Sequence, residues 1–137
     1  MSVDDLTGGC YCGAIRYRIT ARPVFKAQCH CRACQHFSGG GPNYFMLIPP
    51  DGFAYIQGRP SRYARPDLPS PRTREFCATC GTHLTTIRPH APEIVVKVGT
   101  LDDPAVYGGP KAAIYTEDMQ PFHLIPEGLP AFEKLPK

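Results

Sequence analysis

The chain has 137 residues and a formal net charge of +3, with 42% hydrophobic and 20% charged residues. These values are ordinary for a globular protein, and this length suffices for one domain with its own core. The charge is too small and too scattered to indicate a nucleic-acid partner, and no apolar stretch approaches the roughly 20 residues of a membrane span. We therefore expect one domain over residues 1–137, with neither nucleic acid nor a membrane as partner and no prediction of oligomeric state.

Sixteen prolines and thirteen glycines break the chain into short segments, which favours short strands joined by turns over long helices. Apolar runs and alternating patterns predict extended segments, in chain order, at residues 14–19, 25–28, 43–48, 53–57, 72–76, 83–87 and 93–98. Loops are predicted at residues 38–42 and 66–71, and an irregular tail begins at residue 121, with residues 129–132 tied to the surface. The sequence therefore predicts a mostly β protein.

Seven cysteines fall into three groups, which are Cys10 and Cys12, then Cys29, Cys31 and Cys34, then Cys77 and Cys80. The first and last pairs are followed by Gly13 and Gly81. Glycine reaches the positive φ of a sharp metal knuckle without steric cost. The two pairs therefore predict one closed four-thiolate zinc site that connects distant parts of the chain.

The middle group has Gln35 where the other groups have glycine. Cys31 and Cys34 would share one face of a helical turn. Cys29 and Cys31 would share one face of an extended segment, about 6.6 Å apart at the usual strand rise. A strand that ends in a helical turn at Cys31 would bring the three sulfurs to one ion. Three thiolates leave one position of a tetrahedral zinc open, as catalytic zinc requires, so we expect two Zn²⁺ ions per chain.

Cysteines can also form disulfides, a single metal site or an iron–sulfur cluster. An odd count leaves one thiol unpaired, and residues 1–5 lack the basic start and apolar core of a secretory signal. A cytoplasmic location is therefore expected, where disulfides are rare. One four-cysteine site with three free cysteines stays open as an alternative. Iron–sulfur ligation also uses cysteines, but the two glycine-followed pairs fit a single ion better.

Two histidines flank the three-cysteine group, and other residues could also contribute. His30 and His36 could each act as a base or a fourth ligand, or could simply pack at the turn. Arg32 could pair with a substrate carboxylate or remain on the surface. The glycines at residues 39–41 could offer amides to an anion or form only a turn.

Some further polar residues carry no functional prediction. Three histidines show no ligand spacing, and two arginines are expected on the exposed face of a strand. The histidines are His83, His90 and His123, and the arginines are Arg72 and Arg74.

The motifs GCYCGAIRY (9–17), CHCRACQHFSG (29–39) and FCATCGT (76–82), with the closing segment 114–133, resemble the glutathione-dependent formaldehyde-activating enzyme family, which includes centromere protein V. The resemblance covers nearly the whole chain. It implies one zinc domain of small twisted antiparallel sheets, a β-tent-like fold. It implies structural zinc on Cys10, Cys12, Cys77 and Cys80, and catalytic zinc on Cys29, Cys31 and Cys34.

The same resemblance implies a carbon–sulfur lyase or synthase that joins glutathione and formaldehyde into S-(hydroxymethyl)glutathione. A small thiol and a small aldehyde are then the expected partners. Two alternatives remain open beside this enzyme. One is a binding module held together by zinc, and the other is a thiol or metal sensor that releases zinc on oxidation without turnover.

Overall fold

The computed structural model of the chain describes residues 5–136. Residues 1–4 and residue 137 lie outside this range. The expected lack of a secretory signal concerns residues 1–5, so most of that prediction falls outside the described residues. Within the described range the chain forms ten strands, one α-helix and four short 3₁₀ helices, so the mostly β prediction is confirmed. No helix in this range is long and apolar enough to cross a membrane.

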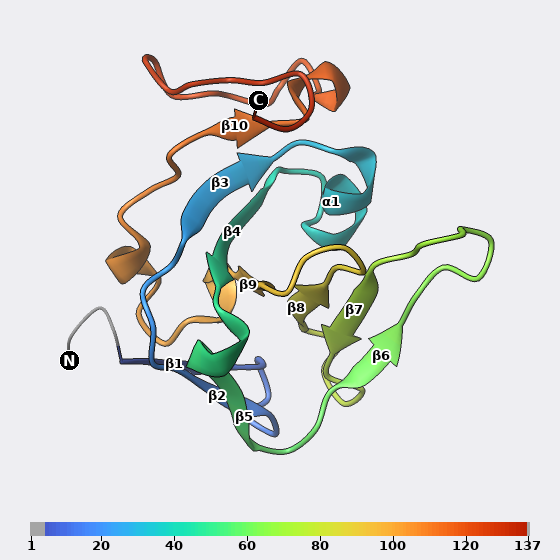
Figure 1. Cartoon of the computed structure of the whole chain (residues 1–137), viewed down its shortest axis with the longest axis vertical. Coiled ribbons are helices and arrows are strands. Elements are labelled where there is room, and N and C mark those ends of the chain that lie inside the picture. Colours follow the sequence, from blue (N-terminus) through green and yellow to red (C-terminus); the bar gives the residue numbers. More distant parts are fainter. Residues whose placement is uncertain (1–4, 137) are drawn as a thin grey trace.

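A three-stranded antiparallel sheet contains the first two strands of the chain (Figure 1). Its strands, in spatial order, are β1 (Leu6–Gly9), β2 (Arg16–Ile19) and β5 (Phe53–Gln57). The turn between β1 and β2 contains the first cysteine pair. This sheet therefore presents one half of the predicted four-cysteine site.

A seven-stranded sheet forms the rest of the scaffold (Figure 1). Its spatial order is β10 (Ala113–Ile114), β3 (Phe25–Cys29), β4 (Asn43–Ile48), β9 (Ile94–Lys97), β8 (His83–Ile87), β7 (Thr73–Phe76) and β6 (Ser61–Tyr63). Its pairs are antiparallel except β10 with β3, which is parallel. Parallel pairing needs a long connection, and here strands β4 to β9 separate the two partners in the chain. The small antiparallel sheets that were expected are thus present, with one parallel pair added at this edge.

The hydrophobic core joins residues of the two sheets. Its fully buried members include Tyr17 and Ile19 of β2, Met46 and Ile48 of β4, and Leu84 of β8. Burying an aliphatic side chain of this kind contributes about 1.5–3 kcal/mol relative to leaving it exposed. The core therefore holds the sheets together in the region between the cysteine-bearing turns.

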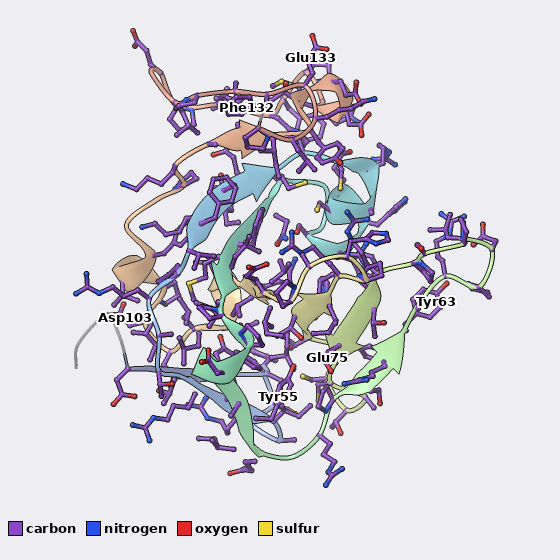
Figure 2. All side chains as sticks on the ribbon, in the orientation of Figure 1. Tyr55, Tyr63, Glu75, Asp103, Phe132 and Glu133 are labelled. Carbon is purple, nitrogen blue, oxygen red and sulfur yellow. The ribbon has the colours of Figure 1, made fainter. Side chains whose placement is uncertain are left out.

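A buried polar link accompanies this core. Tyr55 of β5 donates a hydrogen bond to Glu75 of β7, with 3.1 Å between the hydroxyl and Oε1 (Figure 2). Thr85 of β8 donates to the same carboxylate oxygen at 2.7 Å. Because Glu75 is almost fully buried, these two hydrogen bonds and the ion pair between its Oε2 and Arg62 satisfy the carboxylate.

Candidate metal centres and the adjoining cleft

The first and last cysteine pairs meet at one point. The four sulfurs of Cys10, Cys12, Cys77 and Cys80 all lie within 4.8 Å of one another. The Cys10–Cys12 and Cys12–Cys77 sulfurs are 3.6 and 3.8 Å apart. Sulfurs around a tetrahedral zinc ion would be about 3.8 Å apart, given Zn–S bonds of about 2.3 Å. The donor set and its spacing therefore fit a zinc ion.

The two turns that carry these cysteines have the backbone that their glycines predict. Gly13 and Gly81 have φ values of 83° and 81°. The Gly13 amide donates to the Cys10 carbonyl at 3.1 Å, and the Gly81 amide donates to the Cys77 carbonyl at 2.7 Å. The Ile15 amide donates to the Cys10 sulfur at 3.2 Å. Amides aimed at a sulfur stabilise its thiolate form, which is the form that binds a metal.

The three middle cysteines converge at a strand-to-helix junction, as predicted. Cys29 ends β3, and Cys31 is the N-cap of α1 (Arg32–Phe37), where its sulfur accepts the Cys34 amide at 3.3 Å. The sulfurs of Cys29, Cys31 and Cys34 lie within 4.8 Å of one another. Cys29 and Cys34 are buried, whereas Cys31 is half-buried. Three thiols that converge in this way can hold a metal ion and leave it one position for another ligand.

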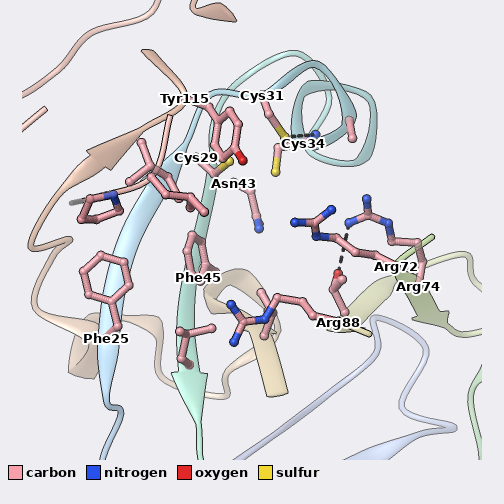
Figure 3. A pocket seen from close by; sticks show the side chains of 17 residues that line it. Phe25, Cys29, Cys31, Cys34, Asn43, Phe45, Arg72, Arg74, Arg88 and Tyr115 are labelled. Atoms are coloured by element: carbon pink, nitrogen blue, oxygen red, sulfur yellow. Dashed lines mark hydrogen bonds between the residues drawn. The ribbon is translucent and has the colours of Figure 1, made fainter. Parts of the chain in front are cut away.

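These three cysteines line one end of a cleft of about 620 Å³ (Figure 3). None of the four cysteines of the other cluster lines this cleft. Apolar side chains of β3, β4 and β9 form one wall, and arginines form another. The apolar wall includes Phe25, Phe45, Leu47 and Val95, and the arginines are Arg72, Arg74 and Arg88.

Neither histidine that flanks the three cysteines lines the cleft. His30 is fully buried, and its Nδ1 lies 3.0 Å from Nδ1 of His123. Its Nε2 lies 3.0 Å from the Gln28 amide nitrogen. His36 is exposed on α1. His30 therefore packs and forms hydrogen bonds at the turn, which was one of the alternatives for it, whereas His36 lies at the surface.

His123 is a residue that the sequence left without a role. Its Nε2 lies 2.7 Å from the Gly40 carbonyl, and its Nδ1 accepts the Gln120 amide at 3.1 Å. The pair His30–His123 thus attaches the C-terminal segment and the glycine loop to the junction that carries Cys29 and Cys31. The two histidines are 93 residues apart, so no local pattern could have indicated the contact.

The arginines of the site differ from those expected. Arg32 is exposed and donates to the side chain of Gln35, and it does not line the cleft. The expectation that Arg74 lies on an exposed strand face is wrong. Arg74 is half-buried, its guanidinium lies 4.8 Å from the centre of the Phe37 ring, and its Nη1 donates to Thr86 Oγ1 at 3.3 Å. The cleft covers this face of β7, which periodicity alone does not reveal.

Two cations lie close to the three cysteines. Lys97 of β9 donates from Nζ to Asn43 Oδ1 at 2.8 Å and to Ser38 Oγ at 3.0 Å. Burial lowers the pKa of Lys97 to about 8, whereas the nearby Cys34 acts in the opposite direction. Burial likewise lowers the pKa of Arg74, again opposed by the cysteines. Both cations therefore favour negative charge on the sulfurs.

The fold and the two thiol clusters define a small, mostly β protein with two candidate metal sites. The family model described as "Glutathione-dependent formaldehyde-activating enzyme" matches residues 5–118. A Halomonas elongata protein named "Putative glutathione-dependent formaldehyde-activating enzyme" is 35% identical over 95 residues. The match covers 66% of this chain and 60% of that relative.

A solved structure shares the fold. It is a crystal structure of a Rhodobacter sphaeroides protein, with a TM-score of 0.59 and 20% sequence identity. The match covers 77% of this chain and 97% of that one. From the family match over residues 5–118, the chain belongs to the glutathione-dependent formaldehyde-activating enzyme family.

Proposed function

We propose that this protein is a zinc-dependent enzyme that forms or breaks the carbon–sulfur bond of a thiol adduct, such as that of glutathione and formaldehyde. The three-cysteine cluster at the end of a 620 Å³ cleft carries the proposal, because a ligand in the cleft can reach these sulfurs. In this proposal Cys29, Cys31 and Cys34 hold the catalytic Zn²⁺, and the four other cysteines hold a structural Zn²⁺.

The reaction needs no oxidant or reductant. In the synthetic direction the thiol sulfur bonds to the aldehyde carbon, and the thiol proton goes to the carbonyl oxygen, which becomes a hydroxyl group. When bound, zinc supplies positive charge that favours the thiolate form of a coordinating thiol. The reverse direction breaks the same carbon–sulfur bond and returns thiol and aldehyde.

The residues around the three cysteines support this chemistry. Asn43 pairs with Cys29 across β3 and β4, lines the cleft and is fixed by Lys97. Its amide group could donate a hydrogen bond to the aldehyde oxygen. Tyr115 points into the cleft beside Cys29 and Cys34 (Figure 3), and its hydroxyl could transfer the proton between sulfur and oxygen.

The location follows from the same chemistry. Two sites that together use seven free thiols are suited to a reducing compartment, and we therefore propose the cytoplasm. The substrates in this proposal are a small thiol and a small aldehyde, and the working unit is one zinc domain.

Zinc per chain and turnover, measured on the same samples, test the proposal. Wild type should contain two zinc ions and consume formaldehyde in the presence of glutathione. The double variant Cys31→Ser, Cys34→Ser should remain soluble, contain one zinc ion and lose turnover. Unchanged turnover in this variant would exclude a working metal at the three cysteines.

A thiol or metal sensor is the alternative that one observation favours. Cys31 is half-buried and faces the cleft beside two further thiols, as an oxidation-sensitive cluster would. A sensor would release one zinc ion readily under mild oxidation and turn over no adduct. Tight binding of both ions together with turnover would instead support the enzyme.

A further inference from the structure

Three arginines gather on one wall of the cleft. Arg72 precedes β7, Arg74 lies within it, and Arg88 follows β8. The two strands pair antiparallel, with Thr73 opposite Ile87 and Arg74 opposite Thr86. Continuing this register by one residue sets Arg72 opposite Arg88. Residues two apart in a strand share a face, so all three side chains point into the same cleft, as Figure 3 shows.

The charge of these arginines is only partly compensated by the described residues. Arg88 forms an ion pair with Glu93, with 3.0 Å between Nη2 and Oε1, but its buried Nε has no partner in the described part of the chain. Arg72 makes no hydrogen bond or ion pair with any residue in the range 5–136. No described residue that lines the cleft is Asp or Glu. Guanidinium groups that line one cleft, one of them without a partner among the described residues, are suited to an anion, which a guanidinium can bind through two parallel hydrogen bonds.

The opposite wall is suited to a different chemical group. Phe25 and Phe45 contact each other edge to face, with ring centres 6.4 Å apart. Leu47 and Val95 extend this apolar surface along β4 and β9. A ligand in the cleft therefore meets sulfur at one end, guanidinium on one side and apolar side chains on the other. Glutathione, a polar peptide, would match the arginines but leave the apolar wall without a partner.

We propose that Arg72, Arg74 and Arg88 form a carboxylate subsite, and that the preferred substrate is a thiol adduct with a carboxylate on an apolar body. The body, an aryl or branched alkyl group, packs on Phe25, Phe45, Leu47 and Val95. The proposal that the substrate is a thiol adduct rests on the proposed function. The proposal of a carboxylate subsite does not, because carboxylate binding requires neither the metal nor turnover.

A thiol-free probe tests the subsite directly. We expect 3-phenylpropionate to bind the zinc-loaded protein at least about 10-fold more tightly than its neutral analogue 3-phenylpropionamide, because hydrogen bonds to a charged group are stronger than those to a neutral group. Isothermal titration calorimetry on both compounds measures this preference. Arg72→Gln and Arg88→Gln should each reduce it. The matched control Arg59→Gln removes the same charge from an exposed residue outside the cleft and should leave it intact.

Turnover of matched adducts separates the two proposals. Formaldehyde would be combined with 2-mercapto-3-phenylpropionate or with the corresponding amide. Carboxylate preference in binding without turnover of any adduct would leave the subsite standing and refute the proposed enzyme. Turnover of both adducts with equal kcat/KM, and equal binding of both probes, would overturn the carboxylate subsite while the enzyme remained. Zinc content and melting temperature of each variant establish that it is folded.

Discussion

Tyr115 has an unusual backbone for a residue with a large side chain. Its φ and ψ are 55° and 40°, the left-handed conformation, and it is the one non-glycine residue with positive φ in the range 5–136. This conformation costs an L-residue roughly 1–2 kcal/mol. The Tyr115 amide donates to the Lys134 carbonyl at 2.9 Å, which helps to hold the backbone in place. Such strain is concentrated at functional sites in proteins, and here it accompanies a ring that lines the cleft.

We predict that Tyr115→Phe lowers kcat for adduct formation by about 100-fold, the lower end of what general acid–base catalysis contributes. Phenylalanine keeps the ring and the same backbone requirement, so KM, zinc content and melting temperature should change little. Steady-state kinetics with glutathione and formaldehyde measure the effect. Tyr44→Phe is the control, because Tyr44 lies outside the cleft and is 45% exposed. Equal kcat in the two variants would remove the Tyr115 hydroxyl from the mechanism.

At the residue scale the sequence predicted the cysteines better than the rest of the site. Cysteine spacing and the following glycines are local, and both thiol groupings form as that pattern indicated. The arginine wall depends on the register between β7 and β8 and on a cleft above that face. The His30–His123 contact depends on the path of the C-terminal segment. Neither feature leaves a periodic signal in the chain.

At the element scale, strands that are followed by proline or glycine were predicted with their correct ends. Pro49 and Pro50 follow β4, and Gly58, with φ of 69°, follows β5. The strands that were not predicted, β1, β6 and β10, are only two to four residues long. In β1, a side chain on Gly8 would approach the Tyr17 hydroxyl to 2.4 Å. Close packing therefore requires glycine at this position. Because glycine has a low β propensity, the sequence does not indicate a strand there.

The knuckle turns make a prediction at this scale. Gly81→Ala should lower the free energy of unfolding by about 1–2 kcal/mol, because alanine is strained at positive φ. No atom lies within 4 Å of the position its Cβ would take, so crowding does not contribute. Gly41→Ala is the matched control, since its surroundings are equally open and its φ is not in the left-handed region. It should leave stability unchanged or raise it slightly. Urea unfolding of the zinc-loaded variants measures both, and equal effects would contradict a conformational role for Gly81.

On the scale of the whole molecule, the four-cysteine cluster joins the two sheets. Cys10 and Cys12 lie in the turn between β1 and β2, whereas Cys77 and Cys80 lie in the turn between β7 and β8. The Tyr11 amide also donates to Thr82 Oγ1 at 3.1 Å, which connects the same two turns. The three-cysteine cluster, by contrast, lies within one sheet and the helix that follows β3. A metal at the first site would therefore fix the arrangement of the sheets, and a metal at the second would not.

This difference predicts unequal effects of single cysteine substitutions. Structural zinc contributes about 10–16 kcal/mol of apparent binding free energy in small peptides, which is comparable to the roughly 5–15 kcal/mol of total stability of a domain. Cys10→Ser and Cys80→Ser should therefore give largely insoluble protein. Cys34→Ser should remain soluble with one zinc ion, because the remaining cluster still connects β1–β2 to β7–β8. Soluble yield and zinc per chain measure the outcome. Equal solubility of all three variants would contradict the division of the cysteines into a structural four-cysteine site and an open three-cysteine site.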